Sequence, residues 1–144
     1  MVNTKKLLGV DYGDARTGMA VCDKTELLAS PVGVLHESWQ PKLVKALGEH
    51  IRAKNAELIV VGNPVNMDGS HGERSEKCAG LAEALENETG IQAVLWDERL
   101  TTVSAHKALN VVDVRNKKRK AVVDAVSAVM ILEDYLKYRK NTSK

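Results

Sequence analysis

The sequence predicts an α/β fold with a mixed central β-sheet, in which antiparallel strands come first and parallel strands follow. Residues 7–23 (LLGVDYGDARTGMAVCD) contain two apolar segments joined by a glycine-bearing turn, which is typical of an antiparallel hairpin. Residues 57–64 and 91–98 are apolar throughout instead of alternating, as expected for parallel strands covered by helices on both faces. Amphipathic segments separate these strands, so the 144 residues are predicted to form one domain, 1–144.

The first half of the chain is predicted to form three strands and one helix. Strands are expected at 5–12 and 17–23, joined by a tight turn at 13–16. A third extended segment at 27–36 contains a proline and a glycine, which predicts a less regular or edge strand. Residues 41–54 place apolar side chains on one helical face, and the initial proline favours a helix start there.

The second half is predicted to continue with a βαβ unit and a long helix. Residues 73–89 have helical periodicity and stop at Gly90, so they form the crossover helix between the two apolar strands. A shorter helical segment is expected at 101–109 and a long helix at 119–138, and residues 140–144 are expected to fray. The chain has neither a GxGxxG nor a GxxxxGK[ST] motif, which argues against dinucleotide-binding and P-loop proteins.

Composition predicts a cytoplasmic globular protein without a membrane partner. Hydrophobic residues make up 44% and charged residues 28%, and no apolar run approaches the roughly 18 residues of a membrane span. Cys22 and Cys78 lack metal-binding spacing, so they are expected as small apolar residues in a reducing compartment, and Trp96 is expected in the core. The net charge of +2 is too small to indicate nucleic-acid binding by itself, so such binding depends on where the charges lie.

Acidic residues end two of the predicted strands. Asp11 closes the first strand, and Asp97 and Glu98 close the last. If these strands are parallel neighbours, their carboxyl ends meet at one edge of the sheet, where ligand sites of open α/β sheets lie. Taken singly, each residue also fits a simpler role, because Asp11 is typical of a turn and the other two are typical of a helix N-terminus.

A third acidic residue lies inside a predicted helix. Asp124 is the only charged residue in AVVDAVSAVMIL (121–132), a segment apolar enough to pack on several sides. A carboxylate in such surroundings is protonated, ion-paired or bound to a metal ion. A salt bridge to Arg99 or Lys118 is the simpler interpretation, whereas a metal site requires further carboxylates, and the strand-ending acids are of the required type.

Three carboxylates without cysteine or paired histidines suit Mg²⁺ or Mn²⁺ and not zinc. Two such ions held about 3.5–4 Å apart activate water and stabilise the leaving oxygen of a phosphodiester. The pattern therefore predicts nuclease chemistry, with two divalent ions as cofactors.

Four segments of the sequence together resemble a known family. They are VDYGDARTGMAV (10–21), VVGNPVNMDGS (60–70), LWDERLTTVSA (95–105) and KKRKAVVDAVSAVMILEDYL (117–136). With these segments in this order, nearly the whole chain resembles the YqgF (RuvX) family of Holliday junction resolvases and pre-16S rRNA nucleases. The resemblance implies an RNase H-like mixed sheet flanked by helices.

The resemblance also implies which residues act. Asp11, Glu98 and Asp124 fall on the catalytic carboxylates of the family, which are expected to bind divalent metal. Asp97 precedes Glu98 in the same segment, so it is either a ligand or a residue that supports one. The family usually has Leu-Pro or Phe-Pro after the strand glycine, and this chain has Asn63 before the proline, a departure that concerns local packing or substrate contact and not the metal site.

The function implied by the family is metal-dependent hydrolysis that matures the 5′ end of the 16S rRNA precursor, with association with the ribosome. Resolution of Holliday junctions in DNA is the alternative within the family, and its two symmetric cuts require a dimer. A non-catalytic RNA- or ribosome-binding module is an alternative of another class. An ATPase of the actin and sugar-kinase type also begins with an Asp-x-Gly strand and turn, but 144 residues leave no room for its second lobe.

Basic and polar residues near these acids are predicted to hold the nucleic acid. The segment RNKKRK (115–120) has five basic residues in six, just ahead of Asp124, and either neutralises phosphates or forms a solvated loop. Arg16 and Arg99 either position the scissile phosphate or pair with the acids, and Asn66 belongs to a polar loop that follows a strand. The predicted contacts are Arg16, Asn66, Arg99, Lys117, Lys118, Arg119 and Lys120.

Overall fold

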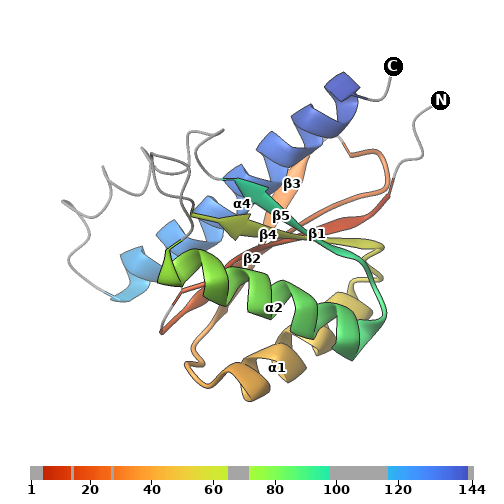
Figure 1. The fold of residues 1–144 in the computed structure, drawn as a ribbon. Coiled ribbons are helices and arrows are strands. Elements are labelled where there is room, and N and C mark those ends of the chain that lie inside the picture. Colours follow the sequence, from red (N-terminus) through yellow and green to blue (C-terminus); the bar gives the residue numbers. More distant parts are fainter. Residues whose placement is uncertain (1–4, 14, 27, 65–71, 98–116, 143–144) are drawn as a thin grey trace.

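The fold is a five-stranded sheet between helices (Figure 1). The computed structural model describes residues 5–13, 15–26, 28–64, 72–97 and 117–142, and of residues 117–124 the backbone only. Its strands are β1 (Leu7–Asp11), β2 (Thr17–Cys22), β3 (Ala29–Leu35), β4 (Leu58–Asn63) and β5 (Ala93–Asp97). Its helices are α1 (Gln40–Ala53), α2 (Glu73–Thr89) and α4 (Lys117–Thr142). Every strand and helix predicted within these ranges is present, and the helix predicted at 101–109 lies outside them.

The sheet mixes antiparallel and parallel pairs, as predicted. Its strand order is β3-β2-β1-β4-β5. The hairpin partners β1 and β2 are antiparallel, as are β2 and β3, whereas β4 is parallel to both β1 and β5. The parallel strands β1, β4 and β5 therefore end at the same edge of the sheet, which is called the carboxyl edge below.

Two expectations about β5 need correction. The first and last strands are not neighbours, because β4 lies between β1 and β5 and pairs with both. Their carboxyl ends still share one edge, since all three strands are parallel. The prediction that β5 is buried like β4 was wrong: β5 is the outer strand, and Leu95 is 40% exposed while β4 is buried along its whole length.

The helices cover opposite faces of the sheet, and each face has its own hydrophobic core. The core between the sheet and α1 and α2 contains Leu8 and Val10 of β1. The core between the sheet and α4 contains Leu7 of β1 and also Trp96, which is buried as predicted. Successive residues of a strand point to opposite faces, so this division assigns a face to every residue of β1.

Helix α4 packs unusually close to β1 because Gly9 has no side chain. A Cβ atom built on Gly9 would lie 3.0 Å from the Cβ of Leu132 and 3.2 Å from the carbonyl oxygen of Ala128. These two helix residues are four apart, one turn, and both are fully buried over the strand. The backbone of β1 at Gly9 is therefore in direct contact with α4.

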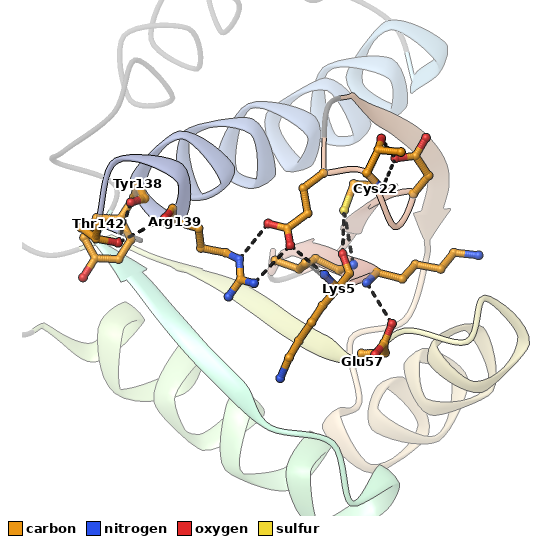
Figure 2. Close-up of polar contacts among 11 residues, drawn as sticks. Lys5, Cys22, Glu57, Tyr138, Arg139 and Thr142 are labelled. Carbon is orange, nitrogen blue, oxygen red and sulfur yellow. Dashed lines mark hydrogen bonds and ion pairs between the residues drawn. The ribbon is translucent and has the colours of Figure 1, made fainter. Parts of the chain in front are cut away.

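An ion pair joins the last turns of α4 to the connection between β2 and β3 (Figure 2). Arg139 of α4 donates from Nε to Oε1 of Glu26 at 2.8 Å and from Nη2 to Oε2 at 3.1 Å. Glu26 also accepts a hydrogen bond from the backbone N–H of Lys5 at 2.7 Å, just before β1 begins. Because the last turns of α4 lie near the start of β1, the helix runs antiparallel to that strand. In Figure 1, the arrow of β4 points toward the side of the molecule where the first turns of α4 lie.

The helix ends follow the expected chemistry, with one difference. Helix α2 ends at Gly90, which has a φ of 72° and donates its N–H to Glu86, so the glycine C-cap is confirmed. Helix α4 continues to Thr142, whereas residues beyond 139 were expected to fray. The Thr142 hydroxyl donates to the carbonyl oxygen of Tyr138 at 2.8 Å and stabilises the last turn.

Cys22 and Cys78 are both buried thiols, as predicted. The sulfur of Cys22 accepts the N–H of Leu7 at 3.3 Å, and burial raises the pKa of this thiol. Among the described residues, no helix is both long and apolar enough to cross a membrane.

Candidate active site

Three polar side chains end the parallel strands at the carboxyl edge. They are Asp11 on β1, Asn63 on β4 and Asp97 on β5. The register pairs Val10 with Val61 and Asn63 with Asp97, so the three strand ends lie within about one residue of the same level. The acids that end β1 and β5 therefore lie at one edge, as predicted from the sequence. Open α/β sheets bind their ligands at this edge.

Asp11 is a buried carboxylate on the α4 face of the sheet. Its side chain is 6% exposed. Gly9, two residues earlier, faces α4, and the alternation of the strand therefore turns Asp11 to the same face. A carboxylate removed from water in this way needs compensating charge or hydrogen bonds, so the position suits a site of charge and not an ordinary exposed turn.

Asp97 lies on the other face. Val94 and Trp96 of β5 belong to the core under α4, whereas Ala93 packs against the core with α1 and α2. By the same alternation, Asp97 is turned toward the α2 face and away from the face of Asp11. Strand geometry therefore separates Asp11 from Asp97, two acids that the sequence had placed together.

Asn63 shares the α2 face with Asp97. It is buried, and its Oδ1 accepts a hydrogen bond from the hydroxyl of Ser75, in the first turn of α2, at 2.7 Å. The residue that departs from the family pattern therefore has a structural partner. Its role in this chain is to join the end of β4 to the start of α2.

The remaining predicted ligands are described in part or not at all. Asp124 is in α4, four residues before Ala128, but only its backbone is described. Glu98 lies outside the described residues. Within the ranges that are described, no group of three His, Cys, Asp or Glu side chains could hold a metal ion, so the three-carboxylate site stays a prediction.

The predicted nucleic-acid contacts are described to the same extent. Arg16 is half-buried at the end of the hairpin turn, directly before β2. Asn66 and Arg99 lie outside the described residues, and residues 117–120 form the first turn of α4 without described side chains. Four residues of the basic segment, 117–120, are therefore part of the helix that contains Asp124.

The hairpin turn after Asp11 depends on a glycine. A Cβ atom on Gly13 would lie 2.2 Å from the backbone oxygen of Arg16, a distance that real contacts do not reach. Any other residue at this position forces the backbone of the turn to move. The glycine after the Asp-Tyr pair is thus explained by the turn that brings the chain back from β1 into β2.

Sequence reasoning missed two residues at this edge, Arg74 and Ser75, in the first turn of α2. Arg74 donates a short hydrogen bond from Nη2 to the carbonyl oxygen of Tyr12, and its guanidinium lies 4.7 Å from the centroid of the Tyr12 ring. These contacts join residues 62 positions apart in the chain. The sequence offered only an Arg-Ser pair at the start of an amphipathic helix, which is ordinary there.

One carboxyl group on α4, that of Asp134, has a perturbed pKa. Burial raises the pKa of Asp134, with a smaller contribution from Glu133 and an opposing one from Lys137. Asp134 is ten residues after position 124, about 15 Å along the helix axis. Its titration therefore concerns the core under the second half of α4.

Comparison with known proteins identifies the class. The structure of Thermus thermophilus RuvC in complex with a Holliday junction substrate aligns with a TM-score of 0.60 at 15% identity, over 92% of this chain and 95% of that one. This likeness concerns the fold alone, and it shows that the chain has a RuvC-like fold. The RNase H-like mixed sheet predicted from the sequence is therefore confirmed.

Sequence comparison then gives the family. A family model described as "RuvX: Holliday junction resolvase" matches residues 5–138, and the chain belongs to this family. A protein of Clostridioides difficile (strain 630) named "Putative pre-16S rRNA nuclease" is 39% identical over 137 residues, which are 95% of this chain and 97% of that protein. A protein of the same name from Halothermothrix orenii is 39% identical over 134 residues, which are 93% of this chain and 96% of that protein. The predicted function class, a nuclease, agrees with the family and with both relatives.

Proposed function

We propose that this protein is a divalent-metal-dependent nuclease that hydrolyses phosphodiester bonds in the precursor of 16S rRNA. Asp11, Glu98 and Asp124 would bind Mg²⁺ or Mn²⁺ at the carboxyl edge, on the α4 face. The observation that supports this most directly is the burial of Asp11 on that face, at the end of the sheet where ligands bind.

The described backbone supports a shared site for Asp11 and Asp124. Asp11 is two residues beyond Gly9, about 6.6 Å along the strand, and position 124 is one turn before Ala128, about 6 Å along the helix. Gly9 and Ala128 are in contact, and the helix is antiparallel to β1. The two acids therefore continue from a common point in the same direction by nearly equal distances.

The choice of Glu98 over Asp97 rests on the family resemblance and on the face of Asp97. In the segment 95–105, Glu98 is the residue that falls on a catalytic carboxylate of the family. Asp97 is turned to the α2 face, away from Asp11. We assign Asp97 a supporting role on the opposite side.

The donor set fits the proposed ions. Three carboxylates and no thiolate or imidazole form a hard-oxygen site, which Mg²⁺ and Mn²⁺ prefer. When bound, such ions activate water and stabilise the charge that develops on a phosphodiester during hydrolysis. The protein itself would hold the ions through its carboxylates and the substrate backbone through Arg16, Arg99 and the basic residues 117–120. Asn66 would be a further contact with the substrate.

Two substrates compete within this proposal. The names of the relatives support a 16S rRNA precursor as the substrate. Association with the ribosome in the cytoplasm is part of the same proposal. The description of the family supports a Holliday junction as the second candidate. Symmetric resolution of a junction requires two active sites, so the second candidate also predicts a dimer.

The test is cleavage of end-labelled 16S rRNA precursor and of a synthetic four-way junction, each with Mg²⁺, Mn²⁺ or EDTA. We expect the RNA to be cut, EDTA to abolish cutting, and Asp11→Asn and Asp124→Asn to lose about 100-fold or more in rate. Cutting of the junction alone, by a protein that sediments as a dimer, would favour the resolvase. Unchanged RNA binding with no cutting of either substrate would refute the nuclease and leave the binding module.

A further inference from the structure

The first turn of α2 contacts the ends of two sheet strands through consecutive residues. Arg74 binds the chain just after β1, at Tyr12, and Ser75 binds Asn63, the last residue of β4. The first turn of α2 is therefore the part of this helix that lies at the carboxyl edge. Both contacts are made at the edge of the sheet that carries the candidate active site.

Arg74 holds Tyr12 in two ways. Its Nη2 donates a hydrogen bond to the Tyr12 carbonyl oxygen, which fixes the main chain. Its guanidinium lies over the Tyr12 ring, 4.7 Å from the centroid, which fixes the side chain on the α2 face. A planar guanidinium can make both contacts at once, and a lysine ammonium cannot reproduce this geometry.

Tyr12 is covalently next to Asp11, and this neighbour relation couples the two faces of the sheet. Because successive strand residues alternate, holding Tyr12 on the α2 face holds Asp11 on the α4 face. Gly13, the next residue along the chain, lies so close to the backbone oxygen of Arg16 that a Cβ atom would not fit there. The Arg74 contacts therefore restrain the main chain next to Asp11 from the opposite side of the sheet.

We propose that Arg74 is a positioning residue for the nuclease reaction: by fixing the Tyr12 main chain and ring, it holds the Asp11 carboxylate in the orientation in which it binds metal. This inference rests on the proposed function. It assigns to α2 a part in catalysis, although α2 covers the face of the sheet away from Asp11.

A matched arginine provides the control. Arg52 of α1 also donates from Nη2 to a main-chain carbonyl, that of Glu88, at 2.9 Å, and it is 52% exposed. Glu88 lies in the last turn of α2, at the end of the helix remote from the carboxyl edge. Removal of Arg52 therefore deletes a similar contact without reaching the residues next to Asp11.

The experiment measures Mn²⁺ binding by calorimetry and cleavage of 16S rRNA precursor by the full chain. The variants are Arg74→Ala, Arg74→Lys, Tyr12→Leu, the double variant of Arg74→Ala with Tyr12→Leu, and Arg52→Ala. We expect Arg74→Ala to weaken Mn²⁺ binding and to lower kcat by about 10- to 100-fold, as for residues that orient metal ligands, with KM for RNA changed by less than about twofold. Arg74→Lys should show most of the same loss, and Arg52→Ala should match the wild type.

Coupling and folding controls keep the test decisive. If Arg74 acts through Tyr12, the double variant should be no worse than the more damaged single variant. Thermal unfolding of each variant separates loss of fold from loss of position. If Arg74→Ala does not fold, Arg74→Lys and Tyr12→Leu give the same comparison.

Two results would overturn the positioning role. The first is that Arg74→Ala binds Mn²⁺ as tightly as Arg52→Ala does and has the same kcat. The second is a raised KM with unchanged kcat, restored by Arg74→Lys, which would make Arg74 a phosphate contact. The same series also tests the proposed function. That function would be overturned if the wild type does not cleave RNA and if Asp11→Asn leaves Mn²⁺ binding unchanged. If the wild type cleaves RNA, Asp11→Asn weakens Mn²⁺ binding and Arg74→Ala has no effect, only the role of Arg74 is overturned.

Discussion

Replacing Gly9 by alanine adds one methyl group between β1 and α4. The added Cβ would lie 3.0 Å from the Cβ of Leu132 and 3.2 Å from the backbone oxygen of Ala128. Carbon atoms pack at about 3.5–4.0 Å, so the helix and the strand must separate by about half an ångström. The Leu132 side chain cannot turn away, because the contact is with its Cβ, and the Ala128 oxygen belongs to the helix backbone.

The free energy of unfolding should fall as a result. Overpacking of a dense core costs about 1–3 kcal/mol. The change from glycine to alanine returns about 0.4–1 kcal/mol, because it reduces the conformational entropy of the unfolded chain. The net loss is at most about 2.6 kcal/mol and about 1.3 kcal/mol at the middle of both ranges, which for a chain of this size lowers Tm by roughly 3–5 °C.

Gly80 provides a matched control in the same protein. It lies in α2, and a Cβ atom there would meet nothing within 4 Å. Gly80→Ala should therefore stabilise the protein by up to about 1 kcal/mol, since alanine favours the helix. Urea unfolding of the two variants and the wild type measures both effects, and the same substitution is expected to have opposite signs at the two sites.

Activity should follow the displacement of α4. A shift of half an ångström between β1 and α4 changes the spacing of Asp11 and position 124, and misplacement of reacting groups by 1 Å costs as much as about 100-fold in rate. We expect Gly9→Ala to lose several-fold in kcat and Gly80→Ala to lose none. Gly9→Ala with wild-type stability and wild-type kcat would refute the close contact between β1 and α4.

Three further predictions concern other parts of the molecule. Gly13→Ala should lower both stability and kcat more than Gly9→Ala does, because the added Cβ would meet the Arg16 backbone oxygen at 2.2 Å and the turn after Asp11 must move. Arg139→Ala should destabilise by about 3–5 kcal/mol in urea unfolding, because it leaves the carboxylate of Glu26, whose side chain is 9% exposed, without its cation. Burial raises the pKa of Asp134 above its unfolded pKa of about 3.9. The contribution of this carboxyl group to stability is therefore fully present below the unfolded pKa and is lost as pH rises through the folded pKa. The unfolding free energy of Asp134→Asn should rise relative to that of the wild type between pH 4 and pH 7.

Each of these predictions has a result that contradicts it. Wild-type kcat in Gly13→Ala would mean that the turn adapts without disturbing Asp11. For Arg139→Ala, the control is Lys24→Ala, which removes an exposed ion pair with Glu57 and should change stability by less than about 1 kcal/mol; equal effects of the two would deny the importance of burial. A constant difference between Asp134→Asn and the wild type from pH 4 to pH 7 would mean that Asp134 does not titrate abnormally.

The sequence predicted most of the fold because its local patterns were unambiguous. The glycine-bearing hairpin, the uniformly apolar strand at β4 and the glycine at the end of α2 each have one common structural solution, and all three were found. The exposure of β5 was missed, because an apolar strand has the same composition whether it is central or lies at the edge of the sheet. The sequence also could not tell that β4 lies between β1 and β5, since strand order depends on long-range packing.

The sequence by itself determined the family, the element order and the acidic residues proposed for the site, because these depend on residue types and their local spacing. Only the tertiary structure decided which face of the sheet each residue occupies. It put Asp11 and Asp97 on opposite faces, joined Asn63 to Ser75, and brought Arg74 onto Tyr12 from 62 residues away. The physical reason is that strand alternation and helix packing bring distant residues together, and no local pattern in the chain encodes those contacts.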